Sequence, residues 1–448
     1  MQKAVCLVSF HVQTTEPILL KFNIGYFLSR KTNFDTEALK LCATYTTKYQ
    51  SHKLFYLSGV KTAYNRFYVD IGSVVGQSDK IWTISLNENS PKTPLLMLHG
   101  MAAGVALWCP NLDALAAARP VYAIDLLGFG RSSRPKFAST PEKVTAQWVE
   151  SIEEWRRELK LQELVLLGHS LGGYIATAYA IKYPERVRHL ILADPWGFAE
   201  KPEAMPEKFK EVPWYVRGIA TMMRPFNPLF AVRAAGPAGR WLVGVTRPDI
   251  PRKYRTYVPE ADEVIPEYIY QCNSQTPSGE SAFHSLMTGF GWARIPMSSR
   301  AKELPACLPV TVLRGARSWL NNDTAGQIAT VRPGESYTSD QLINGAGHHV
   351  YLDKPDTFNK LVNEACERAD AATPAAKRDN STPAAKRDNS TSSQVDSTSK
   401  STDSAPSQAD PTFSQISTAP NAAKRPDSAP DSPTSKSDST TKPDPVAS

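Results

Sequence analysis

Short apolar segments alternate with helical patterns between residues 80 and 355, and this alternation constrains the fold most strongly. The apolar segments cover residues 95–98, 121–124, 164–167, 190–192 and 310–313. Each is apolar with little polar alternation, as expected for strands that are covered on both faces. Helical patterns occupy residues 140–159, 171–182 and 358–368. Strands that alternate with helices predict an α/β fold with a mostly parallel sheet and helices on both faces.

The rest of the chain divides around this core, which we assign to residues 80–196 and 307–369. The intervening segment 197–306 is too long for one crossover connection, so we predict an inserted helical cap. Its many aromatic residues form the core of the cap or line an acyl-chain pocket. Residues 1–79 are expected to be a partly irregular N-terminal extension. Residues 370–448 are mostly small, polar or charged and contain a tandem repeat of TPAAKRDNS, which predicts a disordered tail.

Charge and cysteine content exclude some classes of function and suggest a compartment. The net charge of +7 is spread along the chain, which fits an anionic membrane surface but does not indicate nucleic acid. The 6 cysteines form no CxxC pair, and we expect free thiols in the reducing cytoplasm. No apolar run approaches the ~20 residues of a spanning helix. The low acidity of residues 1–31 leaves mitochondrial targeting open.

The strongest chemical signal is the segment Gly168-His169-Ser170-Leu171-Gly172, which fits the pattern G-x-S-x-G. A predicted strand precedes it and a predicted helix follows, the context that makes this short pattern specific. The sharp turn between them requires small residues beside the serine. Such a strained turn exposes the hydroxyl at a helix N-terminus, where negative charge is stabilised. We therefore predict Ser170 as a nucleophile, against the alternative of an inert serine in a glycine-rich turn, and expect an α/β-hydrolase fold.

A serine hydroxyl needs a base and an orienting acid, and in this fold the order along the chain is Ser, acid, His. His348, on the Gly-rich segment after a strand-like pattern at 341–343, is the predicted base, with its neighbour His349 as the alternative. Asp323 is the first carboxylate after the strand at 310–313 and is the first candidate for the acid. Asp194, at the end of the preceding strand, is the second, and a triad without a conventional acid is the third possibility.

An oxyanion hole requires two backbone N–H donors. We expect one from Leu171, directly after the nucleophile, and the other from Met101, in the loop that follows the strand at 95–98. Gly100 would let this loop approach the scissile carbonyl. The sequence contains no Walker-type loop and no cluster with metal-ligand spacing, so we expect no metal and no cofactor.

A family resemblance rests on six segments of the chain. These segments are residues 123–135, 149–156, 195–198, 225–229, 275–280 and 348–353. They are similar to the α/β-hydrolase-domain-containing proteins four and five, the subfamily that includes the comparative gene identification 58 protein. The resemblance covers about residues 80–368 and implies work on lipids. It implies deacylation of N-acyl phosphatidylethanolamines for member four. For member five it implies coactivation of a triacylglycerol lipase and acyl transfer to lysophosphatidic acid through an H-x-x-x-x-D motif, which His348 and Asp353 match here.

The chain departs from this family at two places that bear on function. The family's acid falls at the position of Asn321, whose amide cannot stabilise a charged imidazole. The tryptophan-rich N-terminal segment that takes member five to lipid droplets has no counterpart before Trp82, which puts droplet targeting in doubt. For Asp353, a turn or helix cap is the alternative to a role in the motif.

Together the motif and the resemblance predict a lipid-directed serine hydrolase that forms an acyl-enzyme on Ser170. The resemblance implies the phospholipase or lysophospholipase type, with substrates like N-acyl phosphatidylethanolamine. The alternatives are a lysophosphatidic acid acyltransferase and a non-catalytic coactivator of a triacylglycerol lipase. The expected partners are a lipid substrate, a membrane or lipid-droplet surface bound peripherally, and, for the coactivator, a lipase.

Overall fold

The computed structural model describes residues 57, 59–202, 229–288, 291–320, 324–332 and 337–372. All of them belong to one compact unit, Met1–Thr382. The expected acid Asp323, the predicted tail beyond residue 372 and most of the N-terminal extension lie outside the described residues.

An 8-stranded sheet forms the centre of this unit, in the order β1-β2-β4-β3-β5-β6-β9-β10. All neighbours from β4 to β10 are parallel, and β2 pairs antiparallel with both β1 and β4, which confirms the mostly parallel sheet. The strands are β1 (Tyr64–Gly72), β2 (Asp79–Leu86), β3 (Leu95–Leu98), β4 (Val121–Ile124), β5 (Leu164–His169), β6 (Val187–Ala193), β9 (Val310–Gly315) and β10 (Thr338–Ile343).

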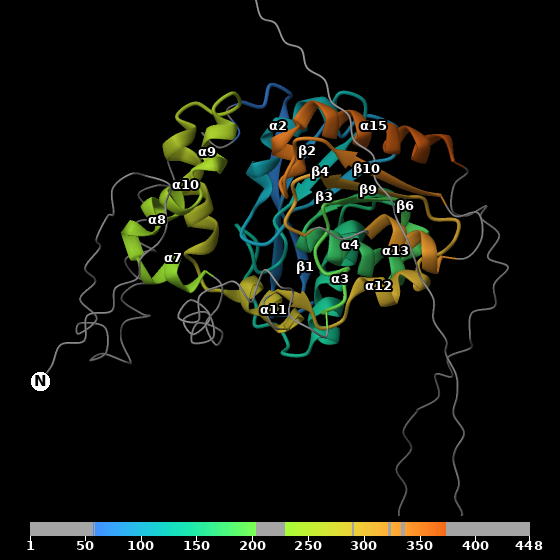
Figure 1. Cartoon of the computed structure of the whole chain (residues 1–448), viewed down its shortest axis with the longest axis horizontal. Helices are drawn as coiled ribbons and strands as arrows, with labels where there is room; N and C mark the ends of the chain where they lie inside the picture. The colour runs from blue at the N-terminus through green and yellow to red at the C-terminus, as the bar shows by residue number, and fades with distance from the viewer. Residues whose placement is uncertain are drawn as a thin grey trace, which may run out of the picture. The chain divides into compact units, whose positions relative to one another are not determined.

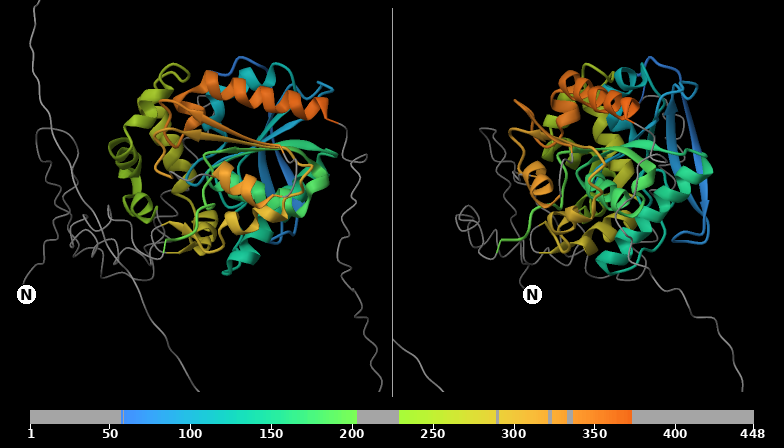
Figure 2. Two further views of the ribbon diagram at one scale, coloured as in Figure 1. Left: turned by 45° about the vertical axis from the view of Figure 1, so that its right-hand side comes forward. Right: turned by 90° about the vertical axis from the view of Figure 1, so that its right-hand side faces the viewer.

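Helices cover both faces of the sheet (Figure 1). They are α2 (Cys109–Ala116), α3 (Pro141–Glu158), α4 (Leu171–Lys182), α13 (Thr324–Val331), α14 (Val350–Asp353) and α15 (Pro355–Ala371). In both views of Figure 2, α15 lies on the opposite side of the sheet from α3 and α4. This two-sided packing explains the apolar strands, because side chains of both faces are buried.

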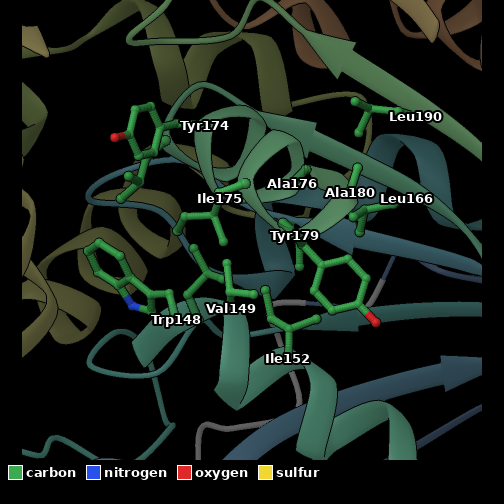
Figure 3. Packing of buried hydrophobic residues seen from close by; sticks show 14 of the residues in the cluster. Trp148, Val149, Ile152, Leu166, Tyr174, Ile175, Ala176, Tyr179, Ala180 and Leu190 are labelled. Atoms are coloured by element: carbon green, nitrogen blue, oxygen red, sulfur yellow. The ribbon is translucent and has the colours of Figure 1, made fainter. Parts of the chain in front are cut away.

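Alternate strand residues supply the two halves of the core. Leu96 and Leu98 of β3 pack into one hydrophobic cluster with α3 and α4. Leu95 and Met97 point to the other face and join the cluster of α2 and α15. Figure 3 shows the first cluster, where side chains of α3, Trp148 among them, pack against side chains of α4.

The sheet begins earlier than expected. β1 and its partner β2 start within the segment 1–79 that the sequence assigned to a partly irregular extension. β1 is an edge strand whose residues alternate between exposed and buried over much of its length, so it lacks the continuous apolar run that marks the inner strands.

The described part of the expected cap is mainly helical. It contains α7 (Phe230–Ala234), α8 (Gly239–Thr246), α9 (Asp249–Tyr254), α10 (Ala261–Asn273), α11 (Ser278–Leu286) and α12 (Met297–Arg300), with a small hairpin of β7 (Met287–Thr288) and β8 (Trp292–Ala293). Helix α10 contacts the loop after β3, where Asn273 Nδ2 donates to the Ala102 carbonyl at 2.9 Å. Among the described residues, no helix is both long and apolar enough to cross a bilayer.

Candidate active site

Ser170 lies at the sharp turn between β5 and α4. Its backbone has φ 52° and ψ −117°, a left-handed conformation that is strained for a residue with a side chain. Glycines make the turn possible. A Cβ on Gly168 would lie 2.3 Å from the carbonyl oxygen of Gly172, and one on Gly172 would lie 2.4 Å from that of Leu98. The local sequence therefore permits the strained turn that presents the serine.

His348 comes from the loop between β10 and α14 and reaches the same place. Its Nε2 lies 3.1 Å from Ser170 Oγ, within hydrogen-bond distance for proton transfer. Ser170 is 8% exposed, so the pair is shielded from most solvent. The alternative base, His349, is the N-cap residue of α14, and the contact with Ser170 Oγ is made by His348.

Asp194 is the carboxylate that contacts this imidazole. Its Oδ2 lies 2.6 Å from His348 Nδ1, and it is buried directly after β6. The same carboxylate accepts hydrogen bonds from the Gly315 N–H at 3.2 Å and from Ser318 Oγ at 2.5 Å. Three donors thus hold the carboxylate in place, and Nδ1 of His348 must carry the proton that it shares with Asp194.

This arrangement differs from the order of preference that the sequence suggested. The first candidate, Asp323, lies outside the described residues, and the second candidate, Asp194, makes the contact. The physical reason lies in the sheet, where β6 lies between β5 and β9, so the end of β6 faces the same edge as the nucleophile. The sequence signal for Asp194 was its position at the end of a strand next to the nucleophile strand. Asp194 also keeps the expected order along the chain, which is Ser, acid, His.

Two further histidines pack against His348. His169 Nε2 lies 2.9 Å from the His348 carbonyl oxygen, which ties the nucleophile turn to the loop of the base. Burial, and then the nearby His348, hold the pKa of His169 well below its ordinary value. Burial, again reinforced by His348, lowers the pKa of His349 to about 3. Both rings are therefore neutral at neutral pH.

The expected oxyanion donors lie on the two segments that meet at Ser170. Leu171 is the first residue of α4, and Met101 lies in the turn after β3. A Cβ on Gly100 would lie 3.1 Å from Ser170 Cβ, so this turn packs directly on the nucleophile. In the part of the chain that the structure describes, the backbone N–H groups of Leu171 and Met101 have no hydrogen-bond acceptor.

Asp353, the acid of the H-x-x-x-x-D motif, lies away from this triad of contacts. Its Oδ2 accepts the Gly347 N–H at 2.6 Å, and its Oδ1 lies 2.5 Å from Lys253 Nζ of α9. These contacts match the alternative role of Asp353 as the cap of a turn, because they hold the loop that carries His348 in place. The contact with Lys253 also joins this loop to the inserted helical cap.

Trp319 is a residue beside the site that sequence reasoning missed. It is 68% exposed, and its ring centroid lies 5.2 Å from that of His348. The sequence drew attention to the aromatic residues of the cap, whereas Trp319 follows β9. Among the described residues, no group of His, Cys, Asp and Glu is arranged to hold a metal ion.

Comparisons with known proteins agree with this architecture. The family model of the alpha/beta hydrolase fold matches residues 93–231. The chain is 48% identical over 297 residues to the 1-acylglycerol-3-phosphate O-acyltransferase ABHD5 of Mus musculus, covering 66% of this chain and 84% of that protein. It is 46% identical over 307 residues to the (lyso)-N-acylphosphatidylethanolamine lipase of Mus musculus, covering 68% and 88%.

Solved structures give the same fold at lower similarity. The lip1 crystal structure from Acinetobacter baumannii matches with a TM-score of 0.50 and 14% identity, over 76% of this chain and 98% of that one. At this identity the match concerns the fold alone. The two curated relatives, together with the family model, show that the chain belongs to the α/β-hydrolase family, in the subfamily that contains ABHD5 and the (lyso)-N-acylphosphatidylethanolamine lipases.

Proposed function

We propose that this protein is a serine hydrolase of acyl lipids in which Ser170, His348 and Asp194 form the catalytic triad. The observation that carries the proposal is the continuous set of contacts from Ser170 Oγ through the imidazole to the Asp194 carboxylate. A hydroxyl, an imidazole and a carboxylate in this order form the arrangement that activates a serine for acyl transfer.

The reaction follows from these positions. His348 Nε2 accepts the proton of Ser170 as Oγ attacks the acyl carbonyl, and Asp194 stabilises the imidazolium that forms. The N–H groups of Leu171 and Met101 stabilise the negative oxygen. The imidazolium then protonates the leaving alcohol or amine, which leaves an acyl-enzyme on Ser170. Water, activated by the same imidazole, releases the acid.

The names of the relatives support a lipid substrate for this site. One is a lipase for N-acylphosphatidylethanolamine and its lyso form, so we propose a glycerophospholipid acyl ester as substrate. Such a lipid resides in a membrane or droplet, and the protein would act there as a peripheral enzyme. The exposed Trp319 beside His348 supports this, because tryptophan favours the boundary between water and lipid.

Acyl transfer is the second candidate reaction, since another relative is a 1-acylglycerol-3-phosphate O-acyltransferase. In that case the hydroxyl of a lysophospholipid would replace water as the acceptor of the acyl group. The coactivator alternative requires no chemistry at Ser170.

The first test is labelling of the full chain by a fluorophosphonate probe, together with turnover of lyso-N-acylphosphatidylethanolamine presented in vesicles. We expect wild type to label, to release fatty acid and to sediment with the vesicles, whereas Ser170→Ala should lose labelling and turnover. Ser151→Ala is the matched control, because Ser151 is a buried serine of α3 that bonds the Trp148 carbonyl. A wild-type protein that binds vesicles but neither labels nor turns over lipid would favour the coactivator. Fatty acid recovered in added lysophosphatidic acid would indicate acyl transfer.

A further inference from the structure

His99 makes two hydrogen bonds that together determine where its proton lies. Its Nε2 lies 3.0 Å from the backbone N of Leu126, and its Nδ1 lies 2.7 Å from the carbonyl oxygen of Gly100. A backbone N–H only donates, so Nε2 must be the acceptor. The single ring proton of the neutral imidazole is therefore on Nδ1 and is donated to the Gly100 carbonyl.

This carbonyl belongs to the same peptide unit as the N–H of Met101. The peptide bond is planar and trans, so its C=O and its N–H point in opposite directions. The Gly100 oxygen also accepts the Ala103 N–H at 3.3 Å, and two donors on one oxygen fix the plane of the unit. A hydrogen bond to the carbonyl also polarises the unit and makes its N–H a stronger donor.

The surroundings keep His99 in this state. The side chain is 2% exposed and its ring packs edge-on against Phe129. Burial lowers the pKa of His99 below its ordinary value, although the nearby Asp125 acts in the opposite direction. Asp125 Oδ1 is 4.0 Å from Nε2, and its carboxylate accepts the N–H groups of Val105 and Arg131 at 2.8 Å each. The ring is therefore neutral and fixed in one tautomer at neutral pH.

From this geometry we infer that His99 is a positioning residue for catalysis. It acts through the Gly100 carbonyl to aim the Met101 N–H at the oxyanion that forms on the substrate. The inference rests on the proposed function, because it requires an acyl transfer with a negative oxygen. The close packing of Gly100 on Ser170 supports it, since a rotated peptide here would change the distance between donor and nucleophile.

Two substitutions separate this role from simple structural support. In His99→Asn the amide nitrogen occupies nearly the position of Nδ1 and keeps the donor to Gly100, but Leu126 loses its acceptor. In His99→Gln the longer side chain reaches the position of Nε2 and keeps that acceptor, but the donor to Gly100 is lost. Both variants lose one buried hydrogen bond, so both should lose stability.

The expected difference is in kcat. Removing one oxyanion donor lowers kcat about 10²–10³-fold, and a misdirected donor should cost part of this. We expect His99→Gln to lower kcat on lyso-N-acylphosphatidylethanolamine about 10- to 100-fold with KM within about threefold, and His99→Asn to keep clearly more activity. A trifluoromethyl ketone inhibitor forms a tetrahedral oxyanion on the serine. Its binding to the His99 variants should weaken in parallel with the fall in kcat.

His189→Asn is the matched control for stability, because the shorter side chain cannot make the hydrogen bond of His189 Nε2 to Thr311 Oγ1. His189 is also buried in the sheet, but it bonds Thr311 Oγ1 at 2.8 Å in the half of β6 away from Asp194. This variant should lose stability and keep kcat. The inference is overturned if His99→Gln retains wild-type kcat, or if kcat in both His99 variants falls only as far as their stability explains. If the wild type itself neither labels nor turns over lipid, the proposed function fails first and this inference with it.

Discussion

A single carboxylate decides whether the imidazole of His348 can act, and this gives a prediction at the scale of one residue. Asp194→Asn would present an amide to Nδ1 and favour the wrong tautomer, so kcat should fall about 10⁴-fold with little change in KM. Asp323→Asn should change kcat by less than about threefold, since the proposed triad does not use it. Steady-state kinetics on both variants decides between the carboxylates, and the reverse pattern would make Asp323 the acid.

The same residues show how far sequence reasoning reached into the site. Ser170 and His348 could be placed because strain and proton transfer demand particular residues at particular points, a serine between glycines and a histidine late in the core. The acid could not be placed, because β6 and β9 are neighbours and their ends share one edge of the sheet. Which of Asp194 and Asp323 reaches Nδ1 depends on loop paths that local patterns do not encode.

At the scale of elements, Arg134 joins the loop after β4 to the cap. Its guanidinium donates to the carbonyls of Gly128 and Gly130 in that loop, at 3.0 and 2.9 Å. It also donates to the carbonyls of Cys272, near the end of α10, and of Thr276, which lies between α10 and α11, at 2.9 Å each. Lysine has a single ammonium group and cannot reproduce this planar set of donors.

Arg134→Lys should therefore lower the free energy of unfolding by about 2–4 kcal/mol, because buried carbonyls lose their donors. Urea denaturation of the full chain, followed by tryptophan fluorescence, measures the change. Arg255→Lys is the control, since Arg255 forms an exposed pair with Asp262 and should change stability by less than about 0.5 kcal/mol. Equal stability of the two variants would show that Arg134 does not connect core and cap.

Elements also differ in how well the sequence predicted them. The strands β3 and β4 have the predicted bounds, because burial on both faces leaves an unbroken apolar run. Helix α4 does too, since the strained serine sets its start. The edge strand β1 was missed because its exposed side chains are polar, and the β7–β8 hairpin is too short to produce a pattern.

Across the whole molecule, several buried histidines couple folding to pH. Burial, and then the charge of Arg368, lower the pKa of His189 to about 3. His349 has a similarly lowered pKa of about 3, and the pKa values of His99 and His169 are lowered as well. These rings are neutral in the folded protein. In the unfolded chain they have a pKa of about 6.5 and take up a proton as the pH falls below it.

Stability should therefore be greatest above pH 6.5 and fall as the pH drops from 6.5 towards 3, since protons bind the unfolded chain more strongly. Between pH 7.5 and 5.5, His189 and His349 should each remove about 1.4 kcal/mol from the free energy of unfolding. His189→Gln removes one of the imidazole rings whose protonation differs between the folded and the unfolded chain. Its loss of stability between the two pH values, measured by urea denaturation, should be smaller than that of wild type by about the same 1.4 kcal/mol. Parallel pH profiles for the two proteins would mean that His189 titrates alike in both states, and that acid unfolding has another origin.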